Sequence, residues 1–345
     1  MLIEVVIVTY KPDKELIQIL DKLNTQTLMP DKIHIINTEE IHLEKLLYGT
    51  NVLNKYKNIF ITNISKFEFD HARTRDRAIR GSKAEYVLCM TQDAIPMDDE
   101  LIEKLLKAFS NPQKSSTNIE EQTQTHKVAV SYARQLPKED CNQVERFTRK
   151  YNYPSESMLK GKEDIERLGI KTYFCSDVCA MYHKETYIDL GGFVSRAIFN
   201  EDMIFAHKAV QNNYYIYYNA EAEVFHSHNY KFMKQLKRNF DLGVSQADHP
   251  EIFNAVSSES EGIRLIKTAM GEFISIKKPY LIIGLLHQAV AKVIGYKLGK
   301  SYKKLKPKTI SRLTSNPNYW IRFKNKKAIE NIDVHNGYGK SELEK

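Results

Sequence analysis

Short apolar blocks and helix-period patterns alternate along the first third of the chain. Residues 2–9 form a nearly continuous apolar run, which is typical of a strand covered on both faces. Further strands are predicted at 33–36, 59–61 and 86–91, and an amphipathic helix at 100–109. A helix after the first strand is predicted from apolar residues at helical spacing: Leu16, Ile19, Leu20 and Leu23. This βαβ order predicts an α/β fold, with a mostly parallel sheet flanked by helices.

The middle of the chain has a different pattern. Residues 111–126 carry one aliphatic side chain and are predicted to form an exposed loop. Residues 134–171 are polar and aromatic without a clear period, and we expect them to fold over a ligand site. A second, more antiparallel half is predicted from strands at 128–133, 173–182, 214–218 and 222–225, a turn at 191–193 and a helix at 201–211.

After residue 230 the pattern becomes helical, which predicts a C-terminal helical extension. Helices are predicted at 231–243 and 261–305, with a loop-like acidic stretch at 244–262 between them. One apolar stripe follows the second helical stretch through Ile282, Leu285, Leu286, Ala289, Val290, Val293 and Ile294. The chain is therefore predicted to divide into an α/β domain, a helical region and a polar tail, at 1–230, 231–310 and 311–345.

The net charge is +8, and its distribution matters more than its size. The apolar stripe runs into a lysine-rich segment, 295–308, that contains no acidic residue. An amphipathic helix with a basic end is suited to an anionic membrane surface. The alternative is a helical hairpin packed on the α/β domain or on a second copy of the chain. No nucleic-acid partner is expected, because the basic residues lack interleaved aromatic side chains.

Two absences bear on the compartment. The first strand starts at residue 2 without a basic leader or cleavage site, and no apolar run approaches the length of a bilayer span. Four cysteines show no paired framework, which predicts reduced, buried thiols: Cys89, Cys141, Cys175 and Cys179. A cytoplasmic protein is the expectation from these patterns.

Candidate chemistry is concentrated between residues 67 and 97. Asp93 follows directly after the strand at 86–91, where open α/β sheets bind their ligands. Arg73 and Arg75 lie one strand earlier, and forked guanidinium groups fit phosphate oxygens. Arginines beside a carboxylate that can hold a divalent cation indicate a nucleotide diphosphate bridged by metal. The alternative is a solvated helix start followed by an ordinary turn aspartate.

Four segments carry a resemblance to a known family. They are Thr9-Tyr10, Thr91-Gln92-Asp93-Ala94, the turn Gly191-Gly192-Phe193 followed by Asn200-Glu201-Asp202, and the stretch AEVFHSHNY at 222–230. In order and spacing they resemble the family 2 glycosyltransferases with the GT-A fold. Within that family the chain is similar to the rhamnosyltransferase-like enzymes of bacterial surface polysaccharide synthesis. The resemblance covers roughly residues 1–305 and includes the segment FDHARTRDRA.

The resemblance implies a divalent metal, Mn or Mg, that bridges the donor phosphates. Asp93 would bind it, although the usual pair of acids is reduced here to one, with Gln92 and Ala94 beside it. His226 and His228 alternate along the last predicted strand, so both rings point to the same face and are candidates for a second ligand. The alternative is a pair of hydrogen-bonded surface histidines.

The resemblance also implies inverting transfer, in which one carboxylate takes the proton of the acceptor hydroxyl. Asp202 is the candidate base and Glu201 the alternative. A helix N-terminus is expected to keep such a carboxylate ionised, and a simple capping pair is the competing interpretation.

The nucleotide is expected to contact residues at the strand ends and in the arginine segment: Thr9, Tyr10, Asn37, Arg73, Arg75, Asp76, Gln92 and Asp93. Asn37 stands where relatives often use an acid. Three aromatic residues before the acceptor side are candidates for acceptor contacts: Tyr151, Tyr153 and Tyr173.

The segment IGYKLGK at 294–300, followed by Tyr302, resembles the C-terminal part of the rhamnosyltransferase-like members. It implies a dTDP-rhamnose donor and a growing, lipid-linked surface glycan as acceptor, with the enzyme in the cytoplasm or peripheral on the inner face of the cell membrane. A homo-oligomer is also compatible with the helical region. One competing function is a sugar nucleotidyltransferase, although Thr9-Tyr10-Lys11-Pro12 replaces its glycine-rich loop. The others are a catalytically silent scaffold and a basic binding protein.

Overall fold

The computed structural model describes residues 1–110, 126–254 and 259–324, so most of the predicted loop at 111–126 lies outside the described residues. The first half alternates strand and helix as predicted: β1 (Ile3–Tyr10), α1 (Lys14–Leu23), β2 (Lys32–Thr38), α2 (Glu40–Leu47), α3 (Val52–Lys55), β3 (Ile59–Ile64), α4 (His71–Gly81), β4 (Tyr86–Thr91), β5 (Ile95–Pro96) and α5 (Leu101–Ser110). The apolar runs and periodic stripes that predicted these elements coincide with their buried positions.

The second half contains more structure than the sequence pattern indicated. Its elements are β6 (Val128–Leu136), α7 (Gln143–Asn152), β7 (Met158–Lys160), η1 (Lys162–Asp164), α8 (Ile165–Leu168), η2 (Gly169–Tyr173), β8 (Cys179–His183), α9 (Lys184–Asp189), α10 (Glu201–Gln211) and β9 (Tyr215–Phe225). Residues 134–171 thus contain helices and a strand, which were not predicted because this stretch has no clear hydrophobic period. The strand predicted at 173–182 begins later, and the two predicted at 214–218 and 222–225 are one continuous strand.

All nine strands of the described residues join one sheet, in the order β3-β2-β1-β4-β8-β6-β9-β5, with β7 also on β9. The strands β1 to β4 are mutually parallel, with Val5 opposite Ile33 and Leu88. Beyond β4 the sheet is mixed, because β8 runs antiparallel to both β4 and β6 while β6 and β9 are parallel. The predicted α/β class is confirmed. The carboxyl ends of β1 to β4 meet at one edge, which is where the candidate site lies.

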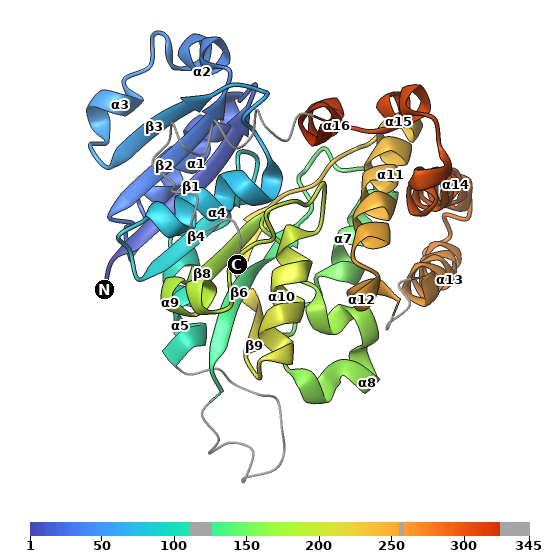
Figure 1. Cartoon of the computed structure of the whole chain (residues 1–345). Helices are drawn as coiled ribbons and strands as arrows, with labels where there is room; N and C mark the ends of the chain where they lie inside the picture. The colour runs from blue at the N-terminus through green and yellow to red at the C-terminus, as the bar shows by residue number, and fades with distance from the viewer. Residues whose placement is uncertain (111–125, 255–258, 325–345) are drawn as a thin grey trace, which may run out of the picture.

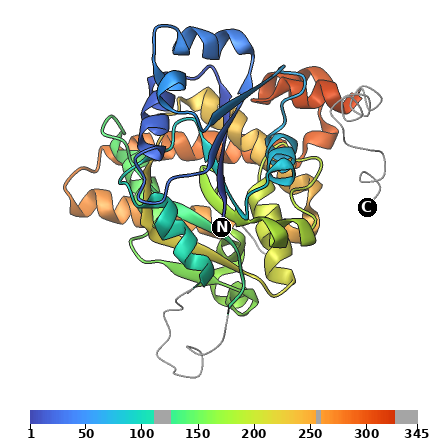
Figure 2. The same cartoon turned by 90° about the vertical axis from the view of Figure 1, so that its left-hand side faces the viewer.

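The sheet separates two apolar cores, and alternate residues of β1 enter each of them. Ile3, Val5 and Ile7 pack with α1 and α5, whereas Val6 and Val8 pack with α4 and α10. Figures 1 and 2 show these helices on opposite faces of the sheet. Both faces are therefore covered, which explains why β1 reads as a continuous apolar run.

The C-terminal region is a helical layer beside the mixed half of the sheet. It contains α11 (Phe232–Asp248), α12 (Pro250–Phe253), α13 (Glu259–Ser275), α14 (Leu281–Lys300), η3 (Tyr302–Lys304), α15 (Pro307–Leu313) and α16 (Pro317–Lys324). The loop predicted at 244–262 is wrong, because helices occupy most of the described part of it. Within the predicted polar tail, α16 is helical and its Tyr319 packs with Phe240 of α11, while residues 325–345 lie outside the described residues.

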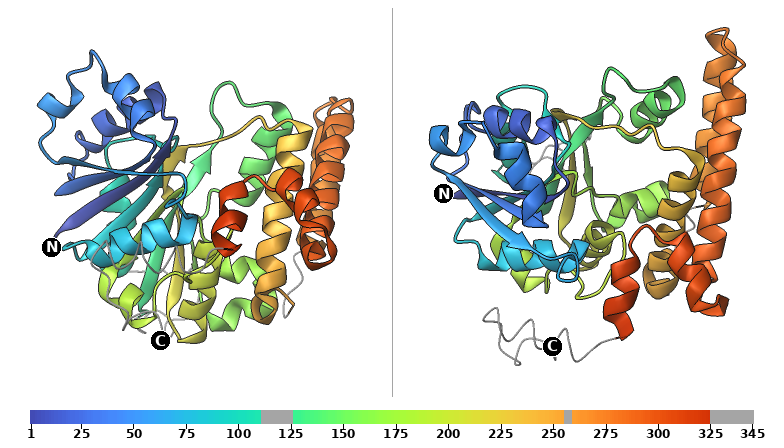
Figure 3. Two further views of the ribbon diagram at one scale, coloured as in Figure 1. Left: turned by 45° about the horizontal axis from the view of Figure 1, so that its top comes forward. Right: turned by 90° about the horizontal axis from the view of Figure 1, so that it is seen from above.

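Helices α11 and α14 approach each other backbone to backbone. A Cβ atom on Gly295 or Gly299 would overlap the carbonyl oxygen of Leu236 or Phe240, respectively. Small residues of α14 thus face α11, and α14 runs along the outer side of α11 in Figure 3. The predicted apolar stripe largely points elsewhere, since Val290 is 50% exposed and Leu286 46%. The close contact makes α14 an integral part of the fold.

Helix α14 also corrects the expectation about membrane-length segments. It has 20 residues, and by length and composition alone it is long and apolar enough to cross a membrane. The sequence reading missed it because its glycines, His287 and three lysines interrupt the apolar run.

Candidate active site

A ladder of polar side chains links the carboxyl ends of the first three parallel strands. The Thr9 hydroxyl donates to Asn37 Oδ1 at 3.0 Å, and Asn37 Nδ2 donates to Asn63 Oδ1 at 2.8 Å. Thr9 and Asn37 are buried, so these bonds satisfy polar groups that water does not reach. The structure thus brings two of the predicted donor-side residues together at the predicted edge.

Gln92 and Tyr10 form a second pair at this edge. Gln92 accepts a hydrogen bond from the Tyr10 backbone N–H at 2.8 Å and donates one to the Tyr10 carbonyl at 3.1 Å. Its amide therefore holds the end of β1 in place. The Tyr10 ring is 40% exposed, with the ammonium groups of Lys11 and Lys66 within 5.4 and 5.3 Å of its centre. A surface hollow of about 420 Å³ beside it is lined by Lys11, Pro12, His42, Lys45 and Leu46.

The two short segments after β4 and β9 build the metal-binding candidate. Strand β5 pairs antiparallel with the end of β9, placing Ile95 opposite Phe225, and this pairing carries Asp93 to the histidines. Asp93 Oδ1 lies 3.5 Å from His226 Nε2, and Asp93 Oδ2 lies 3.2 Å from His228 Nε2. One ligand atom from each of the three residues lies within 4.8 Å of the others. We call Asp93, His226 and His228 the metal trio.

Gln135 fixes the tautomer of His226. Arg149 Nη1 donates to Gln135 Oε1, and since arginine only donates, the oxygen of the amide must face this side. His226 Nδ1 lies 2.8 Å from the same oxygen, so Nδ1 carries the proton and donates it. The lone pair of His226 is therefore on Nε2, which faces Asp93. Such an outer hydrogen bond is what orients imidazole ligands in metal sites.

Burial sets the protonation of the trio. It lowers the pKa of His226 well below its usual range and that of His228 to about 4, more than the Asp93 charge raises them. Burial also opposes ionisation of Asp93, but the two imidazoles and the Thr91 hydroxyl bond of 2.7 Å outweigh it and lower its pKa. At neutral pH the trio is thus one carboxylate and two neutral imidazoles, a donor set that fits a divalent cation.

Three carboxylates and one arginine form a second cluster, which we call the carboxylate cluster. Arg75 Nη1 donates to Glu201 Oε1 at 3.0 Å, and Arg75 Nε lies 3.7 Å from Asp177 Oδ2. The Asp177 backbone N–H donates to Asp202 Oδ2 at 3.1 Å. Glu201 is thereby committed to a buried ion pair, whereas Asp202, half-buried, keeps a carboxylate without a cation partner in the described contacts.

The pKa values of Asp177 and Asp202 are raised, whereas that of Asp93 in the trio is lowered. Burial, with the charges of Asp177 and Glu201, raises the pKa of Asp202 well above its usual value. Burial raises the pKa of Asp177 to about 6, although Arg75 opposes the shift. The expectation that the helix N-terminus keeps Asp202 fully ionised is wrong, because the neighbouring carboxylates and burial dominate. A raised pKa suits a general base, which works best when its pKa lies near the operating pH.

Hydrogen bonds connect the trio to the carboxylate cluster. Gln135, which accepts from His226, donates through Nε2 to Ser176 Oγ at 3.0 Å. Ser176 directly precedes Asp177, whose backbone binds Asp202. The candidate ligand site and the candidate base are therefore held by one continuous set of contacts.

Other predicted residues lie elsewhere. Arg75, predicted to face the nucleotide, is buried under the carboxylate cluster. Asp76 binds Arg80 at 2.9 Å and the Tyr187 hydroxyl at 2.8 Å, on the side of α9. Arg73 is half-buried in the first turn of α4. Tyr153 and Tyr173 are core residues with 5% and 3% exposure, which contradicts their prediction as acceptor contacts; Tyr151 is half-buried.

Sequence reasoning missed Asp177, Gln135 and Arg149. Asp177 had a signal, because an acid within the strand-like run at 173–182 needs a buried partner. Its partners are Arg75, from a distant segment, and the Tyr182 hydroxyl, five residues further along the same run. Gln135 and Arg149 lie in the stretch without a clear period and had no such signal.

The strand edge thus brings together three residues that could hold a cation and a carboxylate with a raised pKa, an arrangement compatible with group transfer from a phosphorylated donor. Residues 4–191 match Glycosyl transferase family 2. The chain is 35% identical over 338 residues to the O-antigen chain rhamnosyltransferase RfbN of Salmonella typhimurium, covering 96% of this chain and 100% of that protein. It is 34% identical over 309 residues to the O-antigen chain rhamnosyltransferase WbaN of Salmonella anatum, covering 88% and 91%. The chain belongs to glycosyl transferase family 2.

Solved structures give a weaker likeness. A mannosyltransferase from Pyrobaculum calidifontis, in complex with GDP-Man and Mn2+, has a TM-score of 0.49 at 12% identity, covering 94% of this chain and 87% of that one. A fragment of S. aureus TarS has a TM-score of 0.45 at 17% identity, covering 88% and 92%. The description of the fold therefore rests on this chain's own sheet. The family establishes the protein as a glycosyltransferase that takes a nucleotide-sugar donor.

Proposed function

We propose that the protein transfers rhamnose from a nucleotide-diphosphate donor, best dTDP-rhamnose, to a hydroxyl of a growing surface glycan, with inversion at the anomeric carbon. The observation that carries the proposal is the identity of about a third to an O-antigen chain rhamnosyltransferase along nearly the whole of both chains. The site supports it, because the metal trio and Asp202 supply the two functions that the reaction requires.

In this proposal Asp202 takes the proton of the acceptor hydroxyl as its oxygen attacks the donor sugar. Its raised pKa lets it hold that proton after the bond forms. The backbone N–H groups of Asp177 and Met203 hold the carboxylate in position. Thr9, Asn37 and the exposed Tyr10 ring are proposed to receive the nucleoside, and the hollow beside Tyr10 offers it room.

The residues of the trio fit a divalent cation, Mn or Mg, since two neutral imidazoles and one carboxylate face one another. When bound, such a cation neutralises charge on the departing diphosphate. The chain's own contribution is to hold Asp93 through Thr91 and His226 through Gln135. Only one carboxylate is present in the trio, so a modest metal affinity is expected.

The test is a panel of nucleotide sugars incubated with the purified chain and a glycan acceptor, with and without Mn2+ or Mg2+. Nucleoside diphosphate release and the linkage of the product are measured, and we expect dTDP-rhamnose to be preferred. Asp93→Asn should lower transfer by about a hundredfold and leave the melting temperature near that of the parent, because Asp93 serves the metal and not the core. Undiminished transfer by Asp93→Asn contradicts the role of the trio, and transfer of another sugar contradicts the donor.

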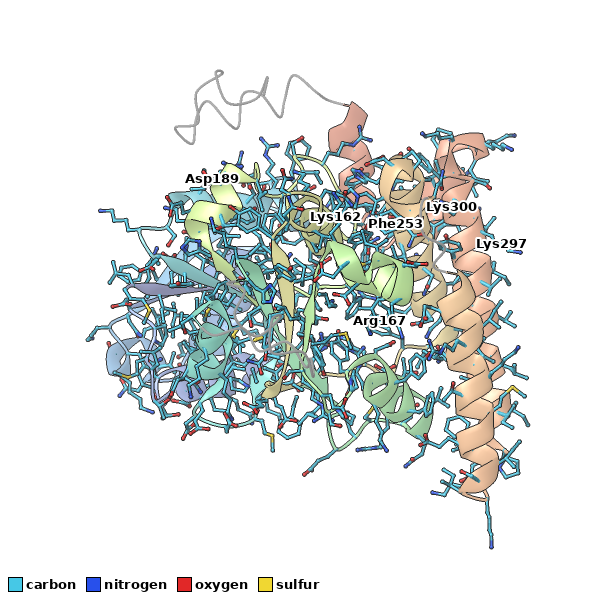
Figure 4. The ribbon with its side chains drawn as sticks, turned by 90° about the horizontal axis from the view of Figure 1, so that it is seen from below. Lys162, Arg167, Asp189, Phe253, Lys297 and Lys300 are labelled. Atoms are coloured by element: carbon cyan, nitrogen blue, oxygen red, sulfur yellow. The ribbon has the colours of Figure 1, made fainter. Side chains whose placement is uncertain are left out.

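We also propose that the enzyme is cytoplasmic and binds the membrane surface through α13 and α14. Large apolar side chains on these helices are exposed: Ile263 at 57%, Ile274 at 60%, Ile283 at 75%, Val290 at 50% and Val293 at 49%. Exposed lysines follow at the end of α14 and beyond it: Lys297, Lys303, Lys304, Lys306 and Lys308. In Figure 4 Lys297 points away from the body of the protein. Lys303 lies 3.7 Å from Asp248, and apolar surface next to the exposed positive charges complements anionic lipid, at about 1 kcal/mol per lysine in low salt.

Flotation with anionic vesicles of phosphatidylglycerol and phosphatidylcholine tests this surface. Removing α14 would expose the face of α11 that it covers, so point variants are the better probe. Ile283→Glu with Val290→Glu should abolish flotation, and high salt should weaken that of the parent. Tyr48→Glu, at a residue 91% exposed in the other half of the protein, is the control. If the parent stays in solution and light scattering gives twice the monomer mass, the face binds a second copy instead.

A further inference from the structure

The segment at 194–199, which leads into α10, rests on the C-terminal helical layer. It forms neither a helix nor a strand, so its path is set by the contacts that it makes with neighbouring elements. Ile198 packs with Phe240 of α11. Arg196 Nε donates a hydrogen bond to the Tyr319 hydroxyl of α16 at 3.1 Å. The chain that delivers the candidate base is therefore held by the C-terminal helices.

A left-handed turn at Asn200 joins this segment to α10. Asn200 has a φ of 65° and a ψ of 23°, a conformation that asparagine tolerates better than most residues. Its side chain forms no capping hydrogen bond with the described part of α10, so the bond that fixes most helix starts is not what fixes this one. Such a backbone conformation persists only where the surrounding contacts hold it. The start of α10, which carries Asp202, is thus set from outside the helix.

Ser245 of α11 supplies an external contact at this turn. Its hydroxyl donates to the carbonyl oxygen of Phe199, the residue before the turn, and its side chain is 2% exposed. Helix α11 is itself firmly held, because Asp241 accepts hydrogen bonds from the Thr314 hydroxyl at 2.7 Å and from the Ser315 N–H at 2.8 Å. It also packs backbone to backbone against α14. The Phe199 carbonyl is therefore tied to a rigid element of the fold.

The body of α10 does not depend on this contact. Phe205, Ala209 and Val210 are fully buried in the apolar core on that face of the sheet. Without the Ser245 hydroxyl the helix would still be anchored by these side chains. Loss of the bond should therefore displace the first turn, with Asp202, more than the rest of the helix.

We infer that Ser245 is a positioning residue for transfer, because its bond to the Phe199 carbonyl holds the turn that aims Asp202 at the acceptor hydroxyl. The inference rests on the proposed function, since it takes Asp202 as the base. The alternative is a buried hydroxyl that only stabilises the fold. A misplaced base lowers kcat and leaves donor binding intact, and a small displacement of a reacting group is enough for a large loss of rate.

Steady-state kinetics compare Ser245→Ala with two matched variants, each measured well below its melting temperature. We expect kcat of Ser245→Ala to fall about tenfold, while KM for dTDP-rhamnose stays within about twofold. Ser245→Thr keeps the hydroxyl and should recover most of kcat. Ser82→Ala removes another buried serine hydroxyl, which donates to Glu4 at 2.7 Å near the start of β1. It should lower the melting temperature without lowering kcat.

A second measurement needs no turnover. The Asp177 backbone N–H donates to Asp202 Oδ2, so hydrogen exchange of this amide, followed by NMR, reports where the Asp202 carboxylate lies. We expect faster exchange in Ser245→Ala, toward the rate in Asp202→Ala, which lacks the acceptor. In Ser82→Ala the rate should equal that of the parent.

Two results would overturn the inference. One is a kcat of Ser245→Ala that equals that of the parent, or a loss that Ser82→Ala matches. The other is an Asp177 amide that exchanges alike in the parent and in Ser245→Ala. The proposed function fails separately: a parent that transfers no rhamnose contradicts the donor, and normal transfer by Asp202→Asn contradicts the base. In both cases faster exchange of the Asp177 amide in Ser245→Ala still shows that Ser245 holds Asp202 in place.

Discussion

The metal trio and the carboxylate cluster are both built from acids close to cationic or potentially cationic groups, yet their protonation differs. In the trio, burial makes the two histidines neutral, and the pKa of Asp93 falls. In the carboxylate cluster a single arginine faces three carboxylates, and the pKa of Asp202 rises. Burial opposes ionisation of both acids; at Asp93 the neighbouring histidines and the Thr91 hydroxyl outweigh it, whereas at Asp202 the charges of Asp177 and Glu201 add to it.

The difference assigns separate tasks to the two clusters. A permanently ionised Asp93 with imidazole lone pairs is suited to hold a cation, whereas an acid with a raised pKa is suited to accept a proton. Arg75, which contacts Asp177 and Glu201, opposes the rise in the pKa of Asp177.

The largest expected effect comes from removing the base. Asp202→Asn should lower kcat by about a thousandfold, because an amide cannot take the acceptor proton. The affinity for dTDP with Mn2+, measured by calorimetry, should stay within twofold of the parent, because the trio is untouched. Glu201→Gln is the matched comparison. If that variant loses transfer while Asp202→Asn keeps it, the base is Glu201.

Arg75→Met should destabilise the protein by about 3–5 kcal/mol, because it leaves Asp177 and Glu201 buried without their cation. Urea unfolding followed by circular dichroism gives the free energy. Lys107→Met, which breaks the exposed pair with Glu103, should leave the unfolding midpoint unchanged. Equal unfolding midpoints for the parent, Arg75→Met and Lys107→Met would show that the charge of Arg75 does not stabilise the fold.

Gln135→Leu should weaken Mn2+ binding by about ten- to a hundredfold, because it removes the acceptor that sets the His226 tautomer. Gln135→Glu keeps that acceptor and should restore most of the affinity. Gln26→Leu, which removes a buried amide bound to Lys22 and Asp98 carbonyls, controls for the loss of a buried glutamine. Nitrogen NMR of the metal-free protein should show Nδ1–H on His226 in the parent, and an Nε2–H form there contradicts the assignment.

The smallest expected effect is a shift of the pH profile. The charge of Asp177 raises the pKa of Asp202, so Asp177→Asn should lower that pKa. Transfer requires the ionised base, and kcat/KM therefore rises with pH through the pKa of Asp202. In the variant this rise should move to lower pH by about one unit. A profile that does not move indicates that another group titrates.

How far the sequence predicts this molecule depends on whether a signal is local. The strands β1 to β4 and the position of Asp93 follow from apolar runs and strand ends, and these were predicted within a few residues. His226 and His228 were expected to share one face because they alternate in the sequence; both lie just past the end of β9, with ring centres 4.7 Å apart. Which face of α14 packs on the protein was not predicted, because its buried residues include the small Ala291, Gly295 and Gly299 while larger apolar residues stay exposed.

The charge state of the site could not be predicted from short segments of the sequence. Arg75 looked like a phosphate contact because its partners, Asp177 and Glu201, come from elements far along the chain. The same holds for Tyr153 and Tyr173, whose burial depends on β9 and α10 closing over them. Residues distant in the sequence determine both the protonation and the burial of these side chains, and those neighbours are not evident before the fold is known.

The two-residue strand β5 has a consequence for biosynthesis. Because Asp93 reaches the histidines only through the pairing of Ile95 with Phe225, the trio forms only after the ribosome has made β9. A nascent chain that carries the first four strands has Asp93 but neither imidazole, so it would offer a cation a single carboxylate. The complete trio, and with it the proposed cation site, therefore exists only once β9 has joined the sheet.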